Sequence, residues 1–253
     1  MNQVRFALIG CGMIANFHAT AIEQIPEATL VGVYDEYRPG AERFVQTRPV
    51  RIFDSLEDML ASDEVDAVFI CTPSGLHTKQ AVAAMRAGKH IVCEKPMSLS
   101  LDDADLLINT AKETGVKVCI ISQFRFSDAA QEIRRALDAG AFGRIVSGSL
   151  QMKYFRSHEY YASGGWRGTW KWDGGGSLMN QSVHTIDILQ WIMGEPESVT
   201  AQIKVANHKI ESEDIGCALV KFKNGAFGTI TGSTATYPGF GTSIEIHGTK
   251  GGI

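Results

Sequence analysis

The strongest constraint on the fold is an alternation that runs through the first half of the chain. Short runs that are apolar on both faces recur at residues 4–10, 29–35, 66–73, 89–96 and 117–124. Segments with a helical pattern separate these runs, at residues 13–25, 38–47, 55–61, 75–87 and 100–114. Strands of this kind lie in a parallel sheet that helices cover on both sides. With right-handed crossovers, the sequence therefore predicts an α/β fold with a doubly wound Rossmann sheet.

The pattern changes near residue 125. A helix is predicted over residues 127–139, and longer strands follow at 144–155, 198–207, 215–222, 226–237 and 242–248. Asn224-Gly225 lies between two of these strands and is a strong hairpin signal. We therefore expect a Rossmann domain over 1–124 and an α+β domain with a mostly antiparallel open sheet over 125–253. The sequence stops just after a strand and a glycine turn, so we also expect a truncated C-terminus.

Charge and hydropathy exclude several classes of protein. The formal net charge of −4, without a block of like charges, predicts no nucleic-acid partner. No apolar run approaches the ~20 residues of a membrane span, which predicts no membrane association. The chain enters its first strand without a secretory leader, so we expect a cytoplasmic protein. The five cysteines are odd in number and lack metal-site spacing, which predicts reduced core thiols and no metal site.

A glycine-rich turn follows the first predicted strand and opens the first predicted helix. Its sequence is Gly10-Cys-Gly12-Met-Ile-Ala15. Gly10 permits the tight turn, and Gly12 lets a pyrophosphate approach the backbone. Met13 and Ile14 begin the helix, whose free N–H groups suit phosphate oxygens. The turn is a candidate dinucleotide-binding site, and the alternative is a purely structural glycine turn.

The choice of cofactor depends on Asp35, which ends the second predicted strand. An acidic side chain at this point hydrogen-bonds the hydroxyls of the adenosine ribose and repels a 2′-phosphate. The predicted cofactor is therefore NAD rather than NADP. The nearby Arg38 is a cation that would weaken this preference.

Two further distinctive turns end predicted strands. Cys71-Thr72-Pro73-Ser74 ends one, and Cys93-Glu94-Lys95-Pro96 ends the next. Because a doubly wound sheet binds ligands at the carboxyl ends of its strands, we expect Thr72, Pro73, Glu94 and Lys95 at the cofactor. Lys95 then brings an ammonium to the nucleotide crevice, although Glu94-Lys95 alone also fits a surface ion pair. His77 is a further cofactor candidate, or it simply opens the next helix.

The segment 173–194 combines predicted burial with a polar stripe. After three glycines, its apolar positions cover too much of the circumference for a surface helix, so we expect it to be largely buried. Asn180, His184 and Asp187 are spaced i, i+4 and i+7 along one side. Burying such groups without partners costs about 1–3 kcal/mol each, so the stripe is expected to face polar groups or a ligand.

These motifs together resemble the glucose–fructose oxidoreductase / inositol dehydrogenase / MocA family. The motifs that carry the resemblance are the glycine turn, CTPSGLH at 71–77, CEKP at 93–96 and the GGG…N…H…D pattern of 174–187. The resemblance covers essentially the whole chain and implies an NAD(P)-dependent oxidoreductase. It implies a Rossmann domain followed by an α/β domain whose open sheet makes oligomer contacts. It further implies that Lys95 and His184 are catalytic and that Lys95–Pro96 is a candidate cis bond.

One position departs from the family pattern. The inositol dehydrogenase branch has an Asp four residues before the His, where this chain has Asn180. An amide cannot accept a proton but can orient a hydroxyl or the imidazole, which puts the inositol substrate in question. With the helix across the interdomain cleft, His184 would accept the hydroxyl proton, and Lys95 would stabilise the charge on the oxygen. Asp187 would either orient His184 or cap a nearby loop.

Residues 153–176 alternate aromatic and cationic side chains. Aromatic rings stack on sugars and Arg binds carboxylate or phosphate, so this segment is a candidate substrate site. The family resemblance implies that Arg167 lies near the substrate, with Trp166, Asn180 and His184 as further candidate contacts. Arg125, at the domain junction, is a further substrate candidate or else braces the domains. The same residue types also favour a subunit interface, which is the alternative for this segment.

We interpret the chain as an NAD-dependent dehydrogenase. We predict that it acts on a secondary hydroxyl of a sugar, of a sugar derivative such as a uronate or UDP-sugar, or of a cyclitol. A homo-oligomer, dimer or tetramer, is expected through the second sheet. One alternative is an NAD-dependent glycosidase, which needs an extra base such as Tyr161 or His158. Another is a non-catalytic nucleotide-sensing module, against which Lys95 and His184 argue.

Overall fold

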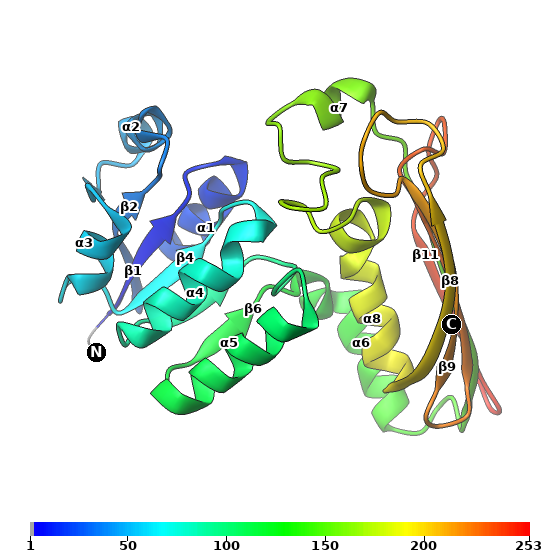
Figure 1. The fold of residues 1–253 in the computed structure, drawn as a ribbon. Helices are drawn as coiled ribbons and strands as arrows, with labels where there is room; N and C mark the ends of the chain where they lie inside the picture. Colours follow the sequence, from blue (N-terminus) through cyan, green and yellow to red (C-terminus); the bar gives the residue numbers. More distant parts are fainter. Residues whose placement is uncertain (1–2) are drawn as a thin grey trace. The chain divides into compact units, whose positions relative to one another are not determined.

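The structure is a computed structural model that describes residues 3–253. The chain divides into two compact units: the first ends at Ile121, and the second spans Ser122–Ile253. Each unit is built on a sheet of its own (Figure 1). Within the described residues, none of the helices has the length and apolar character that a membrane span requires.

The first unit is a six-stranded parallel sheet with the strand order β3-β2-β1-β4-β5-β6. Its strands are β1 (Val4–Ile9), β2 (Ala28–Tyr34), β3 (Arg51–Ile52), β4 (Ala67–Ile70), β5 (His90–Cys93) and β6 (Val118–Ile120). This order is that of the doubly wound dinucleotide-binding fold, so the predicted Rossmann sheet is confirmed. The order reverses between β1 and β4, which is where such sheets bind ligands.

Helices cover both faces of this sheet. They are α1 (Met13–Glu23), α2 (Arg38–Thr47), α3 (Leu56–Ala61), α4 (His77–Arg86) and α5 (Leu101–Thr114). Ala7 and Ile9 of β1 lie in one core cluster with residues of α4 and α5, whereas Leu8 lies in another with residues of α1 and α2. Because successive residues of a strand point to opposite faces, both faces of the sheet are covered, and its strands consist mainly of apolar residues.

Several elements of the first unit differ from the sequence prediction. The short strand β3 lies outside the predicted strands, because two residues are too few to show a periodicity. The run predicted at 117–124 is a strand only as far as Ile120, and Gln123–Phe126 form a 3₁₀ helix. The helix predicted at 75–87 begins as a 3₁₀ turn over Ser74–Leu76 and continues as α4.

The second unit is a five-stranded sheet with the order β11-β7-β10-β9-β8. Its strands are β7 (Ile145–Lys153), β8 (Pro196–Lys204), β9 (Ile215–Phe222), β10 (Phe227–Ser233) and β11 (Ser243–Gly248). All neighbouring pairs are antiparallel except β7 and β10, which are parallel. Asn224 and Gly225 turn β9 into β10, and Gly225 has a φ of 85°, so the predicted hairpin is confirmed.

Helices α6 (Asp128–Asp138) and α8 (Val183–Met193) contribute to the core of this unit, and the short α7 spans His158–Ala162. Leu189 and Met193 of α8 are buried in one cluster with residues of β7 and β9. A Cβ on Gly148 of β7 would lie only 2.7 Å from the sulfur of Met193. The helix therefore lies close against the sheet, and the absence of a side chain at Gly148 permits that approach.

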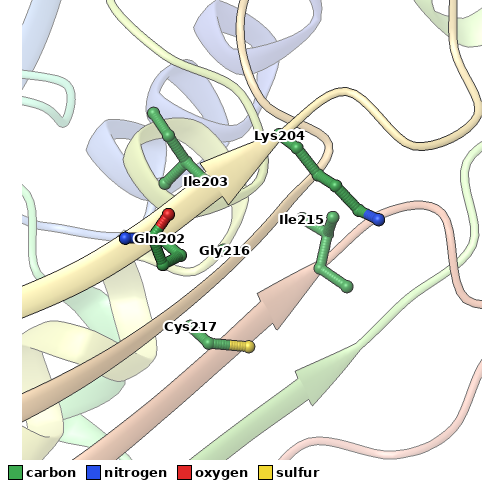
Figure 2. A pocket seen from close by; sticks show the side chains of 6 residues that line it. All are labelled: Gln202, Ile203, Lys204, Ile215, Gly216 and Cys217. Atoms are coloured by element: carbon green, nitrogen blue, oxygen red, sulfur yellow. The ribbon is translucent and has the colours of Figure 1, made fainter.

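The sheet of the second unit also exposes apolar side chains. All nine residues of β8 are exposed, and Leu219 of β9 and Phe227 of β10 are 50% and 52% exposed. A cavity of about 330 Å³ lies along the paired β8 and β9 (Figure 2), and its lining consists of Gln202, Ile203, Lys204, Ile215, Gly216 and Cys217. The homo-oligomer predicted through this sheet stays a prediction.

The cysteines are only partly core residues. All five are free thiols; Cys71 and Cys93 are buried, but Cys119 and Cys217 are exposed. The prediction of core thiols is therefore wrong for these last two, because an apolar strand does not reveal whether the face that carries a given residue is covered. Within residues 3–253 no three His, Cys, Asp or Glu side chains are grouped in a way that could hold a metal ion.

Replacing Leu189 by Ala should destabilise the second unit. Leu189 is 1% exposed, and truncating such a side chain costs about 2–5 kcal/mol. Leu101→Ala is the matched control, because Leu101 is 85% exposed and its loss should change stability by no more than about 0.5 kcal/mol. The free energy of unfolding in urea measures both effects. Equal losses in the two variants would contradict the core position assigned to Leu189.

Candidate active site

Three predicted turns meet at one edge of the first sheet, because their strands pair in register. Ile9 at the end of β1 pairs with Ile70 of β4, and Ile70 pairs with Cys93 of β5. The turns that start at Gly10 and Glu94 therefore leave the sheet on either side of the turn that follows Ile70. This edge is the carboxyl end of the sheet beside the switch point, as the sequence predicts for the cofactor site.

The glycine turn has a backbone that only glycine adopts readily. Gly10 has a φ of 91°. A Cβ at this position would lie 3.0 Å from Cγ2 of Thr72 and 3.1 Å from the carbonyl group of Cys71. Both the conformation and the close approach of the next turn therefore require glycine.

The start of α1 suits a pyrophosphate. Gly12 is the N-cap, and no side chain in the described part of the chain caps the helix, so its first N–H groups are available to phosphate oxygens. A Cβ on Gly12 would meet no atom within 4 Å, so the space beside it is open. Met13 in the first turn is 77% exposed, and Ile14 is half-buried. The residues present therefore fit a dinucleotide.

Asp35 follows β2 and holds the turn through its carboxylate. Oδ2 accepts the N–H of Cys11 at 2.7 Å, and Oδ1 accepts the N–H of Tyr37 at 2.8 Å. Each carboxylate oxygen has a second lone pair that can accept a ribose hydroxyl. Arg38, the cation that would favour NADP, donates to Asp54 at 2.9 Å. This ion pair competes with any contact that Arg38 could make to a 2′-phosphate.

His77 braces the turns that follow β4 and β5. It is the first residue of α4 and only 1% exposed, and its Nδ1 and Nε2 lie 2.8 Å and 2.9 Å from the carbonyl oxygens of Pro96 and Thr72. Burial lowers the pKa of His77, and the two carbonyl groups oppose that shift. Thr72 also donates its hydroxyl to Gln80 at 2.5 Å, and Pro73 precedes the 3₁₀ turn. Cofactor contacts by Thr72, Pro73 and His77 stay a prediction.

Glu94 is a buried carboxylate beside Lys95. It is 9% exposed, its Oε1 lies 2.8 Å from Nε2 of His18 on α1, and its Oε2 accepts the backbone N–H of Lys95 at 3.2 Å. Burial raises the pKa of Glu94, but His18 and Lys95 outweigh burial and lower the pKa overall. The Lys95–Pro96 bond is cis, as the family resemblance implies. The surface-ion-pair alternative for Glu94 therefore does not describe its surroundings.

In the second unit, the segment after the triple glycine begins with a π-helical turn, Ser177–Gln181, before α8. The buried carboxylate of Glu213 accepts the N–H groups of Gly176 at 3.0 Å and Leu178 at 2.8 Å. A Cβ on Gly176 would lie 1.9 Å from the carbonyl oxygen of Glu213, so this position needs glycine. Asn180 thus lies in a wide π turn and not in the regular α-helix that its spacing predicts.

Asn180 is held at both ends of its buried amide. Nδ2 donates to the carboxylate of Asp173, and Oδ1 accepts from Nε2 of Gln181 at 2.7 Å. Asp173 is 2% exposed, and its other oxygen accepts the N–H of Gly168 at 2.8 Å. A carboxylate therefore lies against position 180, although the residue at that position is an amide.

His184 lies half-buried on the first turn of α8, with its ring centroid 5.0 Å from that of Phe124. The carboxylate of Asp187, one turn further on, accepts hydrogen bonds from Nε of Arg125 at 2.7 Å and from Nη2 of Arg125 at 2.6 Å. This bidentate pair joins the 3₁₀ helix that contains Arg125 to α8 within the second unit. Asp187 therefore anchors the segment around Arg125, and the predicted substrate contact of Arg125 stays a prediction.

The aromatic and cationic segment gathers two arginines around Tyr160. The guanidinium carbon of Arg156 lies 5.2 Å from the centroid of the Tyr160 ring, and that of Arg167 lies 4.9 Å from it. Arg167 also lies 5.0 Å from Trp166 and donates from Nη1 to the carbonyl of Ser163 at 2.8 Å. The structure thus brings the predicted pair, Trp166 and Arg167, together with Arg156 and Tyr160.

A cavity of about 780 Å³ adjoins Arg167. Its lining comes from α7, the loop after it and the connection between β8 and β9: His158, Tyr161, Ala162, Gly165, Arg167, Gly168, Thr169, His208, Lys209, Ile210 and Glu211. Tyr161 is buried with its hydroxyl 2.7 Å from Oγ1 of Thr234, and burial raises the pKa of Tyr161 to about 12. With its pKa raised to about 12, the Tyr161 side chain stays a neutral phenol at neutral pH and has no phenolate to accept a proton, which argues against Tyr161 as the base of a glycosidase.

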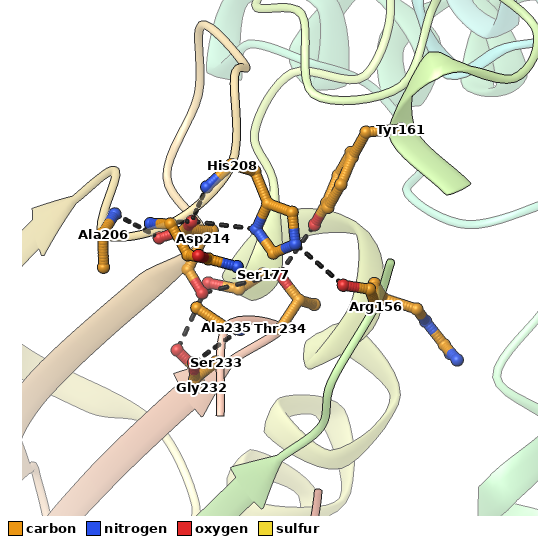
Figure 3. Close-up of polar contacts among 11 residues, drawn as sticks. Arg156, Tyr161, Ser177, Ala206, His208, Asp214, Gly232, Ser233, Thr234 and Ala235 are labelled. Carbon is orange, nitrogen blue, oxygen red and sulfur yellow. Dashed lines mark hydrogen bonds and ion pairs between the residues drawn. The ribbon is translucent and has the colours of Figure 1, made fainter. Parts of the chain in front are cut away.

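A buried hydrogen-bonded pair, His208 and Asp214, fixes the β8–β9 connection beside this cavity (Figure 3). Oδ2 of Asp214 lies 2.9 Å from Nδ1 of His208, and neither side chain is exposed. Asp214 also accepts the N–H groups of Ala206 and Asn207, and Nε2 of His208 lies 2.8 Å from the carbonyl oxygen of Arg156. Burial raises the pKa of Asp214, but the backbone N–H groups and His208 outweigh burial and lower the pKa overall.

Several of these contacts lie outside the sequence prediction. His18 and Glu94 are 76 positions apart, so no local pattern connects them. His208 and Asp214 lie in the loop between β8 and β9. The polar sequence of this loop is typical of an exposed connection, but both side chains are buried. For Asp173, the one available signal is its place directly before the triple glycine.

The strand order, the glycine turn and Asp35 define the first unit as a dinucleotide-binding fold. Comparison with known proteins identifies it further. Residues 4–122 match the family model described as "Oxidoreductase family, NAD-binding Rossmann fold", and residues 130–253 match the "GFO/IDH/MocA C-terminal domain". The chain belongs to the GFO/IDH/MocA family of oxidoreductases. The family resemblance is therefore confirmed, as are the oxidoreductase class and NAD as the cofactor.

Dehydrogenases of sugars and cyclitols are similar to nearly the whole chain. Inositol 2-dehydrogenase of Rhizobium meliloti is 30% identical, over 99% of this chain and 74% of the relative. Glucose-6-phosphate 3-dehydrogenase of Bacillus subtilis is 28% identical, over 97% of this chain and 72% of the relative. The crystal structure of the WlbA dehydrogenase from Bordetella pertussis, in complex with NADH and UDP-GlcNAcA, has a TM-score of 0.96 and 38% identity. That similarity covers 99% of this chain and 73% of the WlbA chain.

Asp35→Asn should weaken the discrimination against NADP⁺. The variant keeps the shape of the side chain but removes the charge that repels a 2′-phosphate, so the ratio of the NADP⁺ and NAD⁺ dissociation constants should fall about tenfold. Titration calorimetry measures both constants. Glu27→Gln, which removes an exposed charge of the same unit, is the control and should leave the ratio unchanged. An unchanged ratio in Asp35→Asn would remove Asp35 from cofactor selection.

Asp214→Asn should destabilise the protein most at neutral pH. Because the folded-state pKa of Asp214 is lowered, the carboxylate stabilises the fold above its unfolded pKa of about 3.9. That contribution is lost as the pH falls through the folded pKa. Removing the carboxylate that accepts these buried hydrogen bonds costs about 1–3 kcal/mol at pH 7, and the difference from wild type should shrink below pH ~4. The free energy of unfolding in urea, measured at several pH values, tests this prediction. The control is Asp105→Asn, which removes an exposed carboxylate. An equal loss of stability in the control, or a loss in Asp214→Asn that does not change with pH, would contradict the prediction.

Proposed function

We propose that the protein is an NAD-dependent dehydrogenase that transfers a hydride between a secondary hydroxyl of a sugar derivative and nicotinamide. The observation that carries the proposal is the strand register of the first unit. Lys95 lies two residues beyond Cys93, at the same sheet edge as the dinucleotide turn that begins at Gly10. A cation at that edge is suited to polarise an oxygen whose charge changes during hydride transfer.

In this proposal, three side chains act on the substrate hydroxyl. Bound nicotinamide supplies the hydride acceptor. His184 takes the hydroxyl proton, because an imidazole exchanges a proton near neutral pH. Lys95 stabilises the negative charge that develops on the oxygen, and Asn180 orients the hydroxyl. The fixed amide of Asn180, held by Asp173 and Gln181, supports an orienting role.

The surroundings of Lys95 support its role as a charged group. The carboxylate of Glu94 accepts the backbone N–H of Lys95, and His18 holds the same carboxylate from α1. The charge of Lys95 is one of the causes that lower the pKa of Glu94, so the two side chains interact electrostatically. The hydrogen bonds of His77 to the turns after β4 and β5 add a rigid support for the same segment.

The named relatives support a sugar derivative as the substrate and differ in which one. WlbA of Bordetella pertussis, with 38% identity, was crystallised with UDP-GlcNAcA, and the relatives of lower identity act on glucose 6-phosphate or inositol. A nucleotide-linked sugar acid is therefore the first substrate to test, in a panel with uronates, aldoses, inositols and sugar phosphates. Formation of NADH scores the panel.

Lys95→Ala should reduce turnover by at least about a hundredfold, because the positive charge that stabilises the reacting oxygen is removed. NAD should still bind, because the phosphate-binding turn is intact. The measurements are the turnover number with the best substrate of the panel and the dissociation constant of NAD from calorimetry. Lys112→Ala, an exposed lysine on α5, is the matched control and should keep full turnover. Unchanged turnover in Lys95→Ala would rule out the proposed mechanism.

A further inference from the structure

We propose that Arg156 and Arg167 form an anion site that binds a carboxylate or phosphate group of the substrate. The inference rests on the proposed function, and it assigns to the second unit the recognition of an acidic substituent. Four observations on the same group of residues carry it: the position of the two guanidinium groups, their lack of acidic partners, their fixed geometry and the adjoining cavity.

Two positive charges converge on one aromatic ring. The guanidinium carbons of Arg156 and Arg167 lie 5.2 Å and 4.9 Å from the centroid of Tyr160. The two arginines come from different stretches of the chain, one directly after β7 and the other from the loop after α7. An aromatic ring stabilises a nearby cation, but two cations at one ring also repel each other.

No acidic group in residues 3–253 neutralises this pair. Neither Arg156 nor Arg167 takes part in an ion pair within the described residues, whereas Arg125, Arg134 and Arg135 of the same unit each pair with an Asp or Glu. Two neighbouring guanidinium groups without a counter-ion generate a local positive potential that attracts an anion. A carboxylate or phosphate would remove the repulsion and accept hydrogen bonds from both arginines.

Hydrogen bonds hold both guanidinium groups in place, and each group keeps N–H donors that can bind an anion. Arg156 donates from Nε and Nη2 to Oε1 of Gln181, and Arg167 donates from Nη1 to Ser163. Within the described part of the chain, Nη1 of Arg156 and Nη2 of Arg167 have no acceptor. The backbone of Arg156 is fixed as well, because its N–H donates to the carbonyl of Thr234 and its own carbonyl faces His208 (Figure 3).

The anion site is directly connected to the residues proposed for catalysis. Nε2 of Gln181 donates to the hydroxyl of Tyr160 at 2.9 Å and to the side-chain oxygen of Asn180 at 2.7 Å. An acidic group bound by the two arginines would therefore be anchored to the same π turn that carries Asn180. A group anchored there would position the rest of a sugar ring for reaction.

The cavity beside Arg167 has room for a larger substituent. Its volume of about 780 Å³ lies within the range of about 300–1,000 Å³ typical of small-molecule sites. Besides Arg167, its lining includes the cationic Lys209 and the ring of His158. The anion is therefore either the carboxylate of a sugar acid or the diphosphate of a nucleotide-linked sugar whose nucleoside enters this cavity.

Binding to the NADH-loaded protein tests the proposal without turnover. Four probes separate the two anions: UDP-GlcNAcA, UDP-GlcNAc without the carboxylate, free N-acetylglucosaminuronic acid without the diphosphate, and UDP alone.

For the variants Arg156→Ala and Arg167→Ala, we expect the dissociation constant of UDP-GlcNAcA to rise at least about tenfold, as loss of a charge-assisted hydrogen bond predicts. The variants Arg156→Lys and Arg167→Lys keep the positive charge but not the planar guanidinium group that binds an anion through two hydrogen bonds. Their affinity for UDP-GlcNAcA should therefore fall less than that of the alanine variants. Arg135→Ala, an exposed arginine of the same unit, is the matched control and should bind as wild type does.

The pattern of losses identifies the anion. Weaker binding of UDP and of both UDP-sugars assigns the arginines to the diphosphate. Weaker binding of only the two sugar acids assigns them to the carboxylate. Unchanged dissociation constants in both alanine variants, or no binding of any probe to the wild type, would overturn the proposal, and so would an equal loss in Arg135→Ala.

The test also separates this inference from the proposed function. If the wild type oxidises neutral sugars with formation of NADH but binds none of the acidic probes, the anion site is wrong and the dehydrogenase stands. If the arginine variants lose UDP-GlcNAcA binding but no sugar yields NADH, the anion site stands and the dehydrogenase is wrong. Melting temperatures of all variants within a few degrees of wild type confirm that the losses are local.

Discussion

In-register pairing of three parallel strands is the interaction on which the chemistry of the first unit depends. Ile9 of β1, Ile70 of β4 and Cys93 of β5 are hydrogen-bonded neighbours, so the turns after them leave the sheet side by side. A shift of one residue in either pairing would move each side chain to the opposite face of the sheet. The close approach of Gly10 to the turn that contains Thr72, and the support that His77 gives to the turns after β4 and β5, depend on this register.

The second unit is organised by two buried carboxylates that are adjacent in sequence. Glu213 accepts N–H groups at the start of the π turn, and Asp214 accepts N–H groups of the β8–β9 connection together with the ring of His208. Buried backbone N–H groups need such acceptors, and a carboxylate takes several of them at once. One short stretch before β9 thus fixes Asn180 through Gly176 and fixes the backbone of Arg156 through His208.

The amide at position 180 illustrates how surroundings define a functional group. Asp173 accepts from Nδ2 of Asn180, and Gln181 donates to Oδ1, so the orientation of the amide follows from its partners. Gln181 also binds Arg156 and Tyr160. A single polar network therefore joins Asn180 to Arg156 and, through the ring of Tyr160, to Arg167 of the proposed anion site.

Features that arise from local patterns could be predicted from the amino-acid sequence alone. Runs apolar on both faces predict a covered parallel sheet, Gly10 and Gly12 predict a phosphate-binding turn, and Asn224-Gly225 predicts a hairpin, because periodicity and backbone freedom act over a few residues. The contacts between distant segments could be known from the folded structure alone. It paired His18 with Glu94, placed Arg156 and Arg167 at one ring, and made the start of the predicted helix a π turn held by Glu213. Burial and charge pairing depend on which segments the fold brings together, and no local pattern contains that information.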